Sequence, residues 1–489
     1  MRKLLTTAAM LAALAAPAWA ARDSITIGMV LEPPNLDPTA GAAAATDEVV
    51  YANIFEGLTR FAADGSIAPA LASGWDVDGG GKVYTFHLHP DIRFHDGASF
   101  DASDVVFSLD RARAADSTNA QKALFEGIER VEAIDPLTVR ITLSAPDGAL
   151  PFKMAWGDAV MVDPASADTN ATRPIGTGPF RFDEWRQGDR VTLTAFDGYW
   201  GRKPALRSAS FRFISDPTAA FSAIMAGDVD AFPNYPAPET LMQLKADPRF
   251  QVITGTTEGE TILAMNNARA PLDNLKLRQA ISHAINRKDI IDGAMFGYGT
   301  PIGSHFAPHH PDYIDLTGQS AFDTALARRL LAESGVDKPV LRLALPPAPY
   351  ARRGGEIVAA QLRAVGIDTR ITNMEWAQWL ETVFRGGDFD LTIVSHTEPM
   401  DIDIYARPDY YFHYAKPEFV ALIDRLRVET NAAVRSGLLK QAQQMIADDA
   451  VNAFLFQLAK TGVADARLRG LWENAPTQAN DLTGVHWAD

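Results

Sequence analysis

A mainly apolar run near the start of the chain constrains the fold more than any other feature. Arg2 and Lys3 precede this run, which extends from Leu4 to Ala16, and the small-x-small tripeptide Ala18-Trp-Ala20 follows it. This order is typical of a cleavable secretory signal. The run is shorter than the about 20 residues that a membrane-spanning helix needs, and no later stretch is long and apolar enough to span. We therefore expect residues 1–20 to be removed on export and the rest to fold in the periplasm.

The sequence contains no cysteine, and this absence shapes two expectations. A lipid anchor would need a cysteine at the new N-terminus, where cleavage leaves Ala21, so we expect free diffusion in the periplasm. Disulfides, thiolate nucleophiles and cysteine metal ligands are excluded, so stability must come from a packed core. The 489 residues, 47% of them hydrophobic, are enough for two or more domains.

The charge balance excludes one class of partner. The formal net charge is −16, and loss of Arg2 and Lys3 makes the mature chain more negative still. Nucleic-acid binding requires a basic face, so we predict no nucleic-acid partner. We interpret the acidic balance as a contribution to solubility.

Apolar periodicity predicts a mixed α/β chain. Alternating apolar residues predict strands over 25–30, 83–88, 137–143 and 191–194. Apolar residues three and four apart predict helices over 275–285, 324–331 and 356–365, and Gly335 and Gly366 are typical helix ends. A further strand-like run over 261–266 is interpreted as a crossing between lobes, and residues 168–174 as a second boundary.

Several short motifs occur in the order found in one known family. They are Glu32-Pro-Pro-Asn-Leu-Asp-Pro38, Ile54-Phe-Glu-Gly-Leu58, Pro69 to Trp75, Phe94-His-Asp-Gly97 with Asp104-Val105 and Arg111, Gly176-Thr-Gly-Pro-Phe180 with Trp185, Tyr199-Trp200, Leu277 to Ile285 with Arg287, and Gly386-Gly-Asp-Phe-Asp390. Each alone is weak, but their ordered sum makes chance agreement improbable. The chain resembles family 5 of the extracellular solute-binding proteins, which serve dipeptide, oligopeptide and nickel importers.

The motifs themselves indicate structure more than chemistry. His95 and the following Asp-Gly pair suit a tight turn, so His95 is interpreted as a hydrogen-bonded turn residue and not a catalyst. Asp101 or Ser103 is a candidate helix cap ahead of the apolar stripe that begins at Val105. The glycines at 176–178 lack a phosphate-binding pattern and indicate a shaped turn.

The resemblance implies a periplasmic binding protein-like α/β fold, in which two lobes close on a ligand in the cleft between them and an extra lobe is inserted in the first. By position, the first lobe comprises residues 22–48, 173–261 and 461–489. The inserted lobe comprises 49–172, and the second closing lobe comprises 262–460. A ligand that contacts both lobes would shift the hinged equilibrium toward the closed state.

The resemblance also implies two ligand-binding segments. In relatives the backbone equivalent to Glu32, Pro34, Asn35 and Leu36 lines the cleft, where peptide is held largely through its main chain. The other segment follows residues 389–390, where peptide binders carry a G-W-x-x-D pattern whose aspartate pairs with the ligand's ammonium group.

This second segment departs from the family pattern. An ungapped comparison puts His396 in place of the tryptophan and Pro399 in place of the aspartate. Proline cannot form the ion pair, so Glu398, Asp401 or Asp403 would have to supply the charge. The alternative is that these acids are solvated loop residues or helix caps.

Further candidates for ligand contacts lie around this loop. Thr397 belongs to the loop itself, and Trp376 lies on a predicted helix face with a second tryptophan three residues on. Arg385 is a candidate partner for a ligand carboxylate. Arg407 stands in the aromatic run 404–414, which either stacks on the ligand or packs in the core.

A metal carrier within the same family is one alternative. His87 and His89 alternate on a strand and share one face, and His309 and His310 adjoin prolines in a loop. Cysteine is absent and so is a His-Glu-x-x-His pattern, so we predict no metal and no cofactor. Residues 76–81 are interpreted as a hairpin turn and not as a calcium loop.

An exported hydrolase is the alternative from a different class. No Gly-x-Ser-x-Gly elbow is present and no Ser, His and acid set stands out, so we predict that the chain is not an enzyme. The predicted ligand is a peptide or peptide-like solute, with an opine, a sugar, a glutathione-like peptide or a nickel chelate left open. The resemblance implies an inner-membrane ABC permease and its ATPase subunits as partners, and we expect a monomer.

Overall fold

A computed structural model describes residues 22–41, 43–397, 401–414 and 416–488. Most strands belong to one sheet of eleven strands, in the order β15-β14-β16-β12-β17-β11-β1-β10-β9-β8, with β13 paired to β17. Their bounds are β1 (Ser24–Met29), β8 (Phe180–Arg186), β9 (Arg190–Ala195), β10 (Ser208–Phe213), β11 (Ala231–Phe232), β12 (Phe250–Met265), β13 (Thr300–Pro301), β14 (Val340–Leu345), β15 (Asp368–Asn373), β16 (Leu391–His396) and β17 (Asn452–Asp465).

A second sheet of four antiparallel strands has the order β4-β5-β7-β6, with β4 (Ala72–Asp78), β5 (Val83–Leu88), β6 (Ile128–Asp135) and β7 (Thr138–Leu143). Helix α2 (Ala102–Arg113) begins at Asp101, which forms a capping box with Asp104. Val105 and Leu109 of α2 are buried in one core with strand residues of this sheet. Two strand pairs are smaller, β2 (Thr59–Phe61) with β3 (Ile67–Pro69) and β18 (Leu468–Arg469) with β19 (His486–Trp487).

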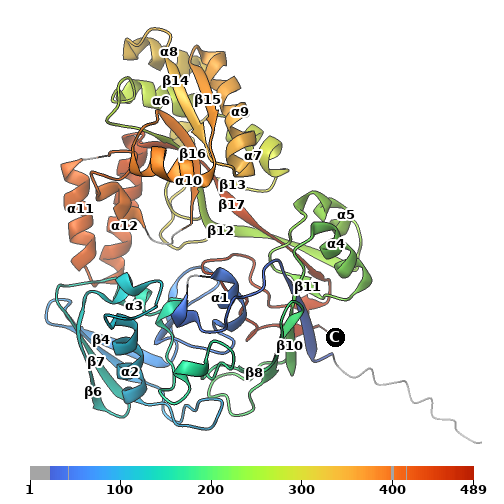
Figure 1. Cartoon of the computed structure of the whole chain (residues 1–489). Helices are drawn as coiled ribbons and strands as arrows, with labels where there is room; N and C mark the ends of the chain where they lie inside the picture. The colour runs from blue at the N-terminus through green and yellow to red at the C-terminus, as the bar shows by residue number, and fades with distance from the viewer. Residues whose placement is uncertain (1–21, 42, 398–400, 415, 489) are drawn as a thin grey trace, which may run out of the picture.

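Helices cover the part of the large sheet that contains β14, β15 and β16 (Figure 1). Gly335 and Gly366 end two of these helices in the left-handed conformation, with φ of 73° and 99°. The helices are α6 (Leu275–Ala284), α7 (Arg287–Met295), α8 (Thr324–Ser334), α9 (Pro349–Val365), α10 (Trp376–Trp379), α11 (Pro417–Val428) and α12 (Ala432–Asp448), and elsewhere α1 (Ala44–Val50), α3 (Leu150–Lys153), α4 (Pro217–Ala226) and α5 (Leu241–Lys245). No helix of the described residues is both long and apolar enough to cross a membrane.

Strands β12 and β17 connect two parts of the molecule. They pair antiparallel along most of their length and run from the helix-covered part of the sheet to the part that holds β10 and β11 (Figure 1). Their register shifts between Thr256 and Glu260, where β12 is irregular. The side-chain amide of Gln457 bridges this irregular stretch by donating to the Thr257 carbonyl at 2.6 Å.

Several of the family motifs contact one another in space. The Glu56 carboxylate accepts hydrogen bonds from Thr177 Oγ1, Tyr199 Oη and Trp200 Nε1, at 2.8, 2.9 and 3.0 Å. His95 Nε2 lies 3.0 Å from the Gly178 carbonyl, which confirms its prediction as a hydrogen-bonded turn residue. The predicted strands, helices, helix ends and the hairpin turn after β4 are likewise confirmed, and Asp101 is the helix cap. These motifs therefore hold the scaffold together on one side of the β12 and β17 connection.

Candidate functional site

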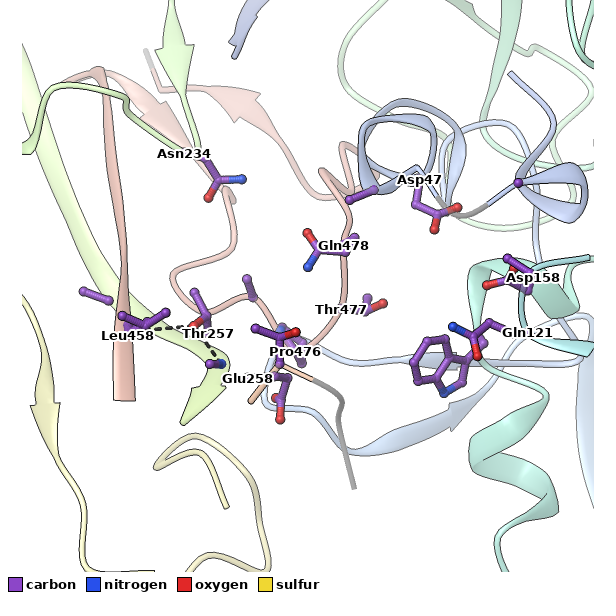
Figure 2. A pocket seen from close by; sticks show the side chains of 18 of the residues that line it. Asp47, Gln121, Asp158, Asn234, Thr257, Glu258, Leu458, Pro476, Thr477 and Gln478 are labelled. Atoms are coloured by element: carbon purple, nitrogen blue, oxygen red, sulfur yellow. Dashed lines mark hydrogen bonds between the residues drawn. The ribbon is translucent and has the colours of Figure 1, made fainter. Parts of the chain in front are cut away.

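The main candidate site is a cavity of about 650 Å³ beside the irregular stretch of β12. Such a volume lies in the range of small-molecule sites in proteins. Figure 2 shows Asp47, Gln121 and Asp158 on one side of the cavity and Thr257, Glu258 and Leu458 on the other. Met295 of α7, Tyr350 of α9 and Thr397 also line it. The cavity therefore receives residues from both parts that β12 and β17 connect.

The wall formed by β12 and β17 is held by its own hydrogen bonds. Thr257 Oγ1 donates to the Leu458 carbonyl at 2.9 Å and accepts from the Gly259 amide at 3.0 Å (Figure 2). The carboxylate of Glu258 lies 2.8 Å from His309 Nε2, and His309 Nδ1 lies 2.6 Å from Thr256 Oγ1. This wall is thus preorganised, and its one acidic side chain already has a partner.

The opposite wall carries two carboxylates with free acceptor capacity. Asp47 lies on α1, and Asp158 lies in the short helix η3 (Gly157–Ala159). Asp158 is only 7% exposed, yet its Oδ1 has no hydrogen-bond partner among the described residues, and the same holds for Asp47 Oδ1. A buried acceptor without a partner is costly, so this wall is suited to receive a donor.

The electrostatics of the cavity are acidic. None of the described residues that line it is Lys, Arg or His. Burial raises the pKa of Asp158 to about 6. Burial, together with the charges of Asp158 and Glu48, raises the pKa of Asp47 well above its ordinary value. With three acidic side chains and no basic one in its described lining, the cavity favours a positively charged group, which would stabilise the ionised carboxylates.

A buried acid–histidine–acid group lies next to this site. His305 Nδ1 is 2.8 Å from Glu260 Oε1, and His305 Nε2 is 2.8 Å from Asp401 Oδ1. Burial alone would lower the pKa of His305, but the two carboxylates raise it to about 10. Burial raises the pKa of Glu260 to about 7. The group ties Glu260 of β12 to Asp401.

The predicted N-terminal segment is engaged within its own part of the fold. The Glu32 carboxylate accepts from Trp185 Nε1 and from the Gly188 amide, each at 3.0 Å. The side-chain oxygen of Asn35 accepts a hydrogen bond from the backbone amide of Asp37 at 2.9 Å. Pro34 is exposed, and Leu36 is buried. The structure brings none of these four side chains to the cavity lining as described.

The other predicted residues lie on β16 and on the segments before and after it. Thr397 lines the cavity, and His396 is buried with its Nε2 3.0 Å from Tyr411 Oη. Trp376 is 42% exposed and contacts Trp379 edge to face. Arg385 pairs with Glu381 at 3.0 Å and Arg407 with Asp403 at 2.9 Å. Glu398 lies outside the described residues.

Sequence reasoning missed Asp47, Asp158 and the aromatic Trp156, which also lines the cavity. Asp47 and Asp158 come from segments that are far apart in sequence, so no local spacing signals their approach. The only sequence hint is the glycine that precedes Asp158. Among the described residues no group of three or more His, Asp or Glu is placed to hold a metal ion.

The comparison with known families is decisive for the class of protein. The family model for bacterial extracellular solute-binding proteins, family 5, matches residues 66–459. The chain belongs to this family. Family 5 consists of substrate-binding proteins of transporters and not of enzymes, and a solute-binding site between two parts of the fold agrees with that membership.

Individual family 5 relatives cover most of the chain. The glutathione-binding protein GsiB of Pectobacterium atrosepticum is 33% identical over 77% of this chain and 74% of its own. The dipeptide-binding protein of Escherichia coli is 29% identical over 78% of this chain and 79% of its own. The structure of HbpA2 from Haemophilus parasuis has a TM-score of 0.88 at 23% identity, covering 95% of this chain and all of that one (100%). The periplasmic binding protein-like fold is thereby shown.

Proposed function

We propose that this chain is the exported solute-binding component of an ATP-driven importer, and that it captures a peptide or peptide-like solute in the cavity beside β12. The observation that carries the proposal is that residues from both parts joined by β12 and β17 line one cavity. A solute that contacts both sides stabilises a closed state over an open one. The closed protein would then be read by an inner-membrane permease and its ATPase subunits.

We propose the lobe boundaries as 22–48, 173–261 and 461–489 for the first lobe, 49–172 for the inserted lobe and 262–460 for the second closing lobe. Two features support them. The four-stranded sheet lies wholly between residues 72 and 143, and β14, β15 and β16 lie between 340 and 396. Both proposed crossings, at 261 and 461, fall inside the paired strands β12 and β17.

The ligand class is proposed from the relatives and from the charge of the cavity. Relatives are named for binding glutathione and dipeptides, and a third, from Haemophilus influenzae, for binding heme. The acidic lining suits a solute that carries an ammonium group. The role of Asp401 as partner of that ammonium stays a prediction, and its Oδ1 is already 2.8 Å from His305.

The location and assembly are also part of the proposal. Residues 1–20 have the composition of a secretory signal, which supports release into the periplasm. We propose that the protein is a monomer there. An opine, a sugar or a chelate carried by the same fold is the second candidate ligand class.

Mass spectrometry of the protein purified natively from its periplasm tests the ligand class, because a tightly bound solute copurifies. A thermal-shift screen of peptides, opines, sugars and chelates follows, since a ligand that binds only the folded state raises Tm. Peptides are expected to raise Tm. A shift with another solute class and none with peptides would reject the peptide assignment, and catalytic turnover of the bound solute would reject the carrier function itself.

A further inference from the structure

We propose that Asp47 and Asp158 form a subsite for a second kind of recognition, the binding of a cationic side chain or amine of the solute at the wall opposite β12. This inference rests on the proposed function and names the chemistry that the cavity selects. It predicts a preference for solutes with a lysine-like ammonium or an arginine-like guanidinium. The subsite is distinct from the loop after β16, where the sequence predicted capture of the peptide's ammonium.

The first support is the unsatisfied acceptor at Asp158. Its side chain is 7% exposed and lines the cavity, and its Oδ1 lacks a hydrogen-bond partner among the described residues. Buried carboxylate oxygens are normally hydrogen-bonded, so this enclosed oxygen would gain a donor from a solute group that packs against the wall. An N–H of a cation makes a stronger bond to a carboxylate than a neutral donor does.

The second support is the way in which Gly157 brings the two carboxylates together. A Cβ at position 157 would lie 2.6 Å from Asp47 Oδ1 and 2.8 Å from its Cγ. Real Cβ atoms do not approach so closely, so a side chain at position 157 would displace the Asp47 carboxylate from its place against η3. The absence of a side chain at position 157 thus leaves room for the Asp47 carboxylate next to the residue that precedes Asp158.

The third support is the chemistry around the pair. Trp156 and Gln121 line the same end of the cavity (Figure 2 labels Gln121 beside Asp158). An indole ring next to carboxylates is suited to a cation, which it attracts through its π-face. Glu48, which follows Asp47 on α1, acts on Asp47 by its charge, and Lys460 acts in turn on Glu48. Lys460 Nζ donates to the Trp472 carbonyl at 2.7 Å. No described cation lining the cavity competes for the pair.

Ionisation of the pair is disfavoured in the free protein, and a bound cation would favour it. In the unliganded protein burial and the neighbouring carboxylates raise the pKa of Asp47, and burial raises that of Asp158 to about 6. A site that destabilises the free protein and is relieved by ligand is typical of binding residues rather than of structural ones. Substitution of Asp158 should therefore stabilise the free protein while it weakens binding.

The test uses calorimetric titration of the full mature chain with trialanine peptides that carry lysine, norleucine or glutamate at each position in turn. Norleucine keeps the aliphatic chain of lysine and removes its ammonium. For at least one position, the lysine peptide is expected to bind about tenfold more tightly than the norleucine peptide. Asp158→Asn and Asp47→Asn should each abolish this preference. Asp168→Asn, an exposed acid of the same charge change, should keep it.

The Tm of the variants distinguishes a binding role from a structural one. Asp158→Asn is expected to raise the Tm of the unliganded protein and to reduce the shift that the lysine peptide produces. Equal affinity of lysine and norleucine peptides, with trialanine still binding, overturns the subsite and leaves the proposed function intact.

Failure of every peptide instead rejects the proposed peptide function. Titration with free arginine and free putrescine then tests the subsite. Binding of these cations that does not depend on Asp158 overturns the subsite. Binding of Ca²⁺ alone that depends on Asp158, without binding of any amine, would overturn the ammonium assignment.

Discussion

His305 Nε2 lies 2.8 Å from the Asp401 carboxylate, and the same imidazole meets Glu260 on its other side. His305 is only 4% exposed. One buried cation therefore faces two carboxylates, and its removal would leave both without a counter-charge.

His305→Gln is expected to lower the free energy of unfolding by about 3–5 kcal/mol, because it breaks a buried ion pair and leaves uncompensated charge. Urea unfolding at pH 7 measures the loss. The double variant His305→Gln with Glu260→Gln removes one of the stranded carboxylates and should recover part of the stability. A loss below about 1 kcal/mol in the single variant would show that the group is not an ion pair in solution.

The same group predicts a dependence on pH. The carboxylates raise the pKa of His305 to about 10 in the folded protein. A raised histidine pKa adds stability that is fully present below about pH 6.5, the unfolded value, and is lost as pH rises toward the folded one. We expect stability to fall between pH 7 and 10 in the native protein and to fall less in His305→Gln. NMR of the imidazole at pH 8 should show His305 still protonated, and a neutral ring at that pH would contradict the assignment.

Glu56 predicts a second titration, in a lower pH range. Burial raises its pKa to about 7 despite three donors, Thr177, Tyr199 and Trp200. The folded protein holds this proton more tightly than the unfolded chain, so the stability that it contributes is lost as pH rises from about 4.5 to about 7. Glu56→Gln should remove about 2–3 kcal/mol of the decrease seen between pH 4.5 and pH 8. Asp168→Asn serves as the control, and an unchanged profile in Glu56→Gln would refute the shift.

The absence of cysteine makes closure directly measurable. Asp110 on α2 and Glu356 on α9 are exposed and lie on different parts of the molecule. Spin labels on Asp110→Cys with Glu356→Cys should report a shorter distance when a ligand is added, because the ligand favours the closed state. A distribution that does not move at saturating ligand would argue against hinged closure.

Gly157 offers a test of the Asp47 geometry without touching a charge. Gly157→Ala would place a Cβ 2.6 Å from Asp47 Oδ1 and must displace that carboxylate. The lysine peptide should lose affinity about threefold or more, while the norleucine peptide changes little. Gly437→Ala is the matched control, since a Cβ there meets nothing within 4 Å. Parallel losses for both peptides would point to a general distortion of the cavity.

The sequence pattern predicted elements well where local periodicity is undisturbed. The strand predicted over 83–88 has the bounds of β5. The helix predicted from 356 begins instead at Pro349. The prediction started too late because Gly354 and Gly355 interrupt the helical pattern in the sequence. A Cβ at Gly355 would lie 2.4 Å from Leu345 Cδ1, so the glycine that hides the helix is the one that lets it approach the sheet.

The site was harder to predict than the fold for a similar reason. The crossing strand was predicted over 261–266, but β12 begins at Phe250, and its first half is rich in polar residues and glycine. A Cβ at Gly255 would lie 2.1 Å from the Glu473 carbonyl, so the C-terminal segment packs closely against β12 at this position. Glycine is needed there, and the apolar alternation that predicts a strand is therefore absent. The cavity forms at this stretch, and its lining comes from chain segments whose contact no periodicity encodes.

The placement of the cavity against β12 and β17 has a mechanical consequence. Thr257, Glu258 and Leu458 belong both to the connection and to the cavity wall. A rotation moves each atom in proportion to its distance from the axis, so a turn about these strands would displace Thr257 little and the outer surfaces near Asp110 and Glu356 much more. A small rotation caused by a solute bound beside these strands would thus produce a large displacement of the outer surfaces. A membrane complex that contacts those surfaces could tell a loaded molecule from an empty one.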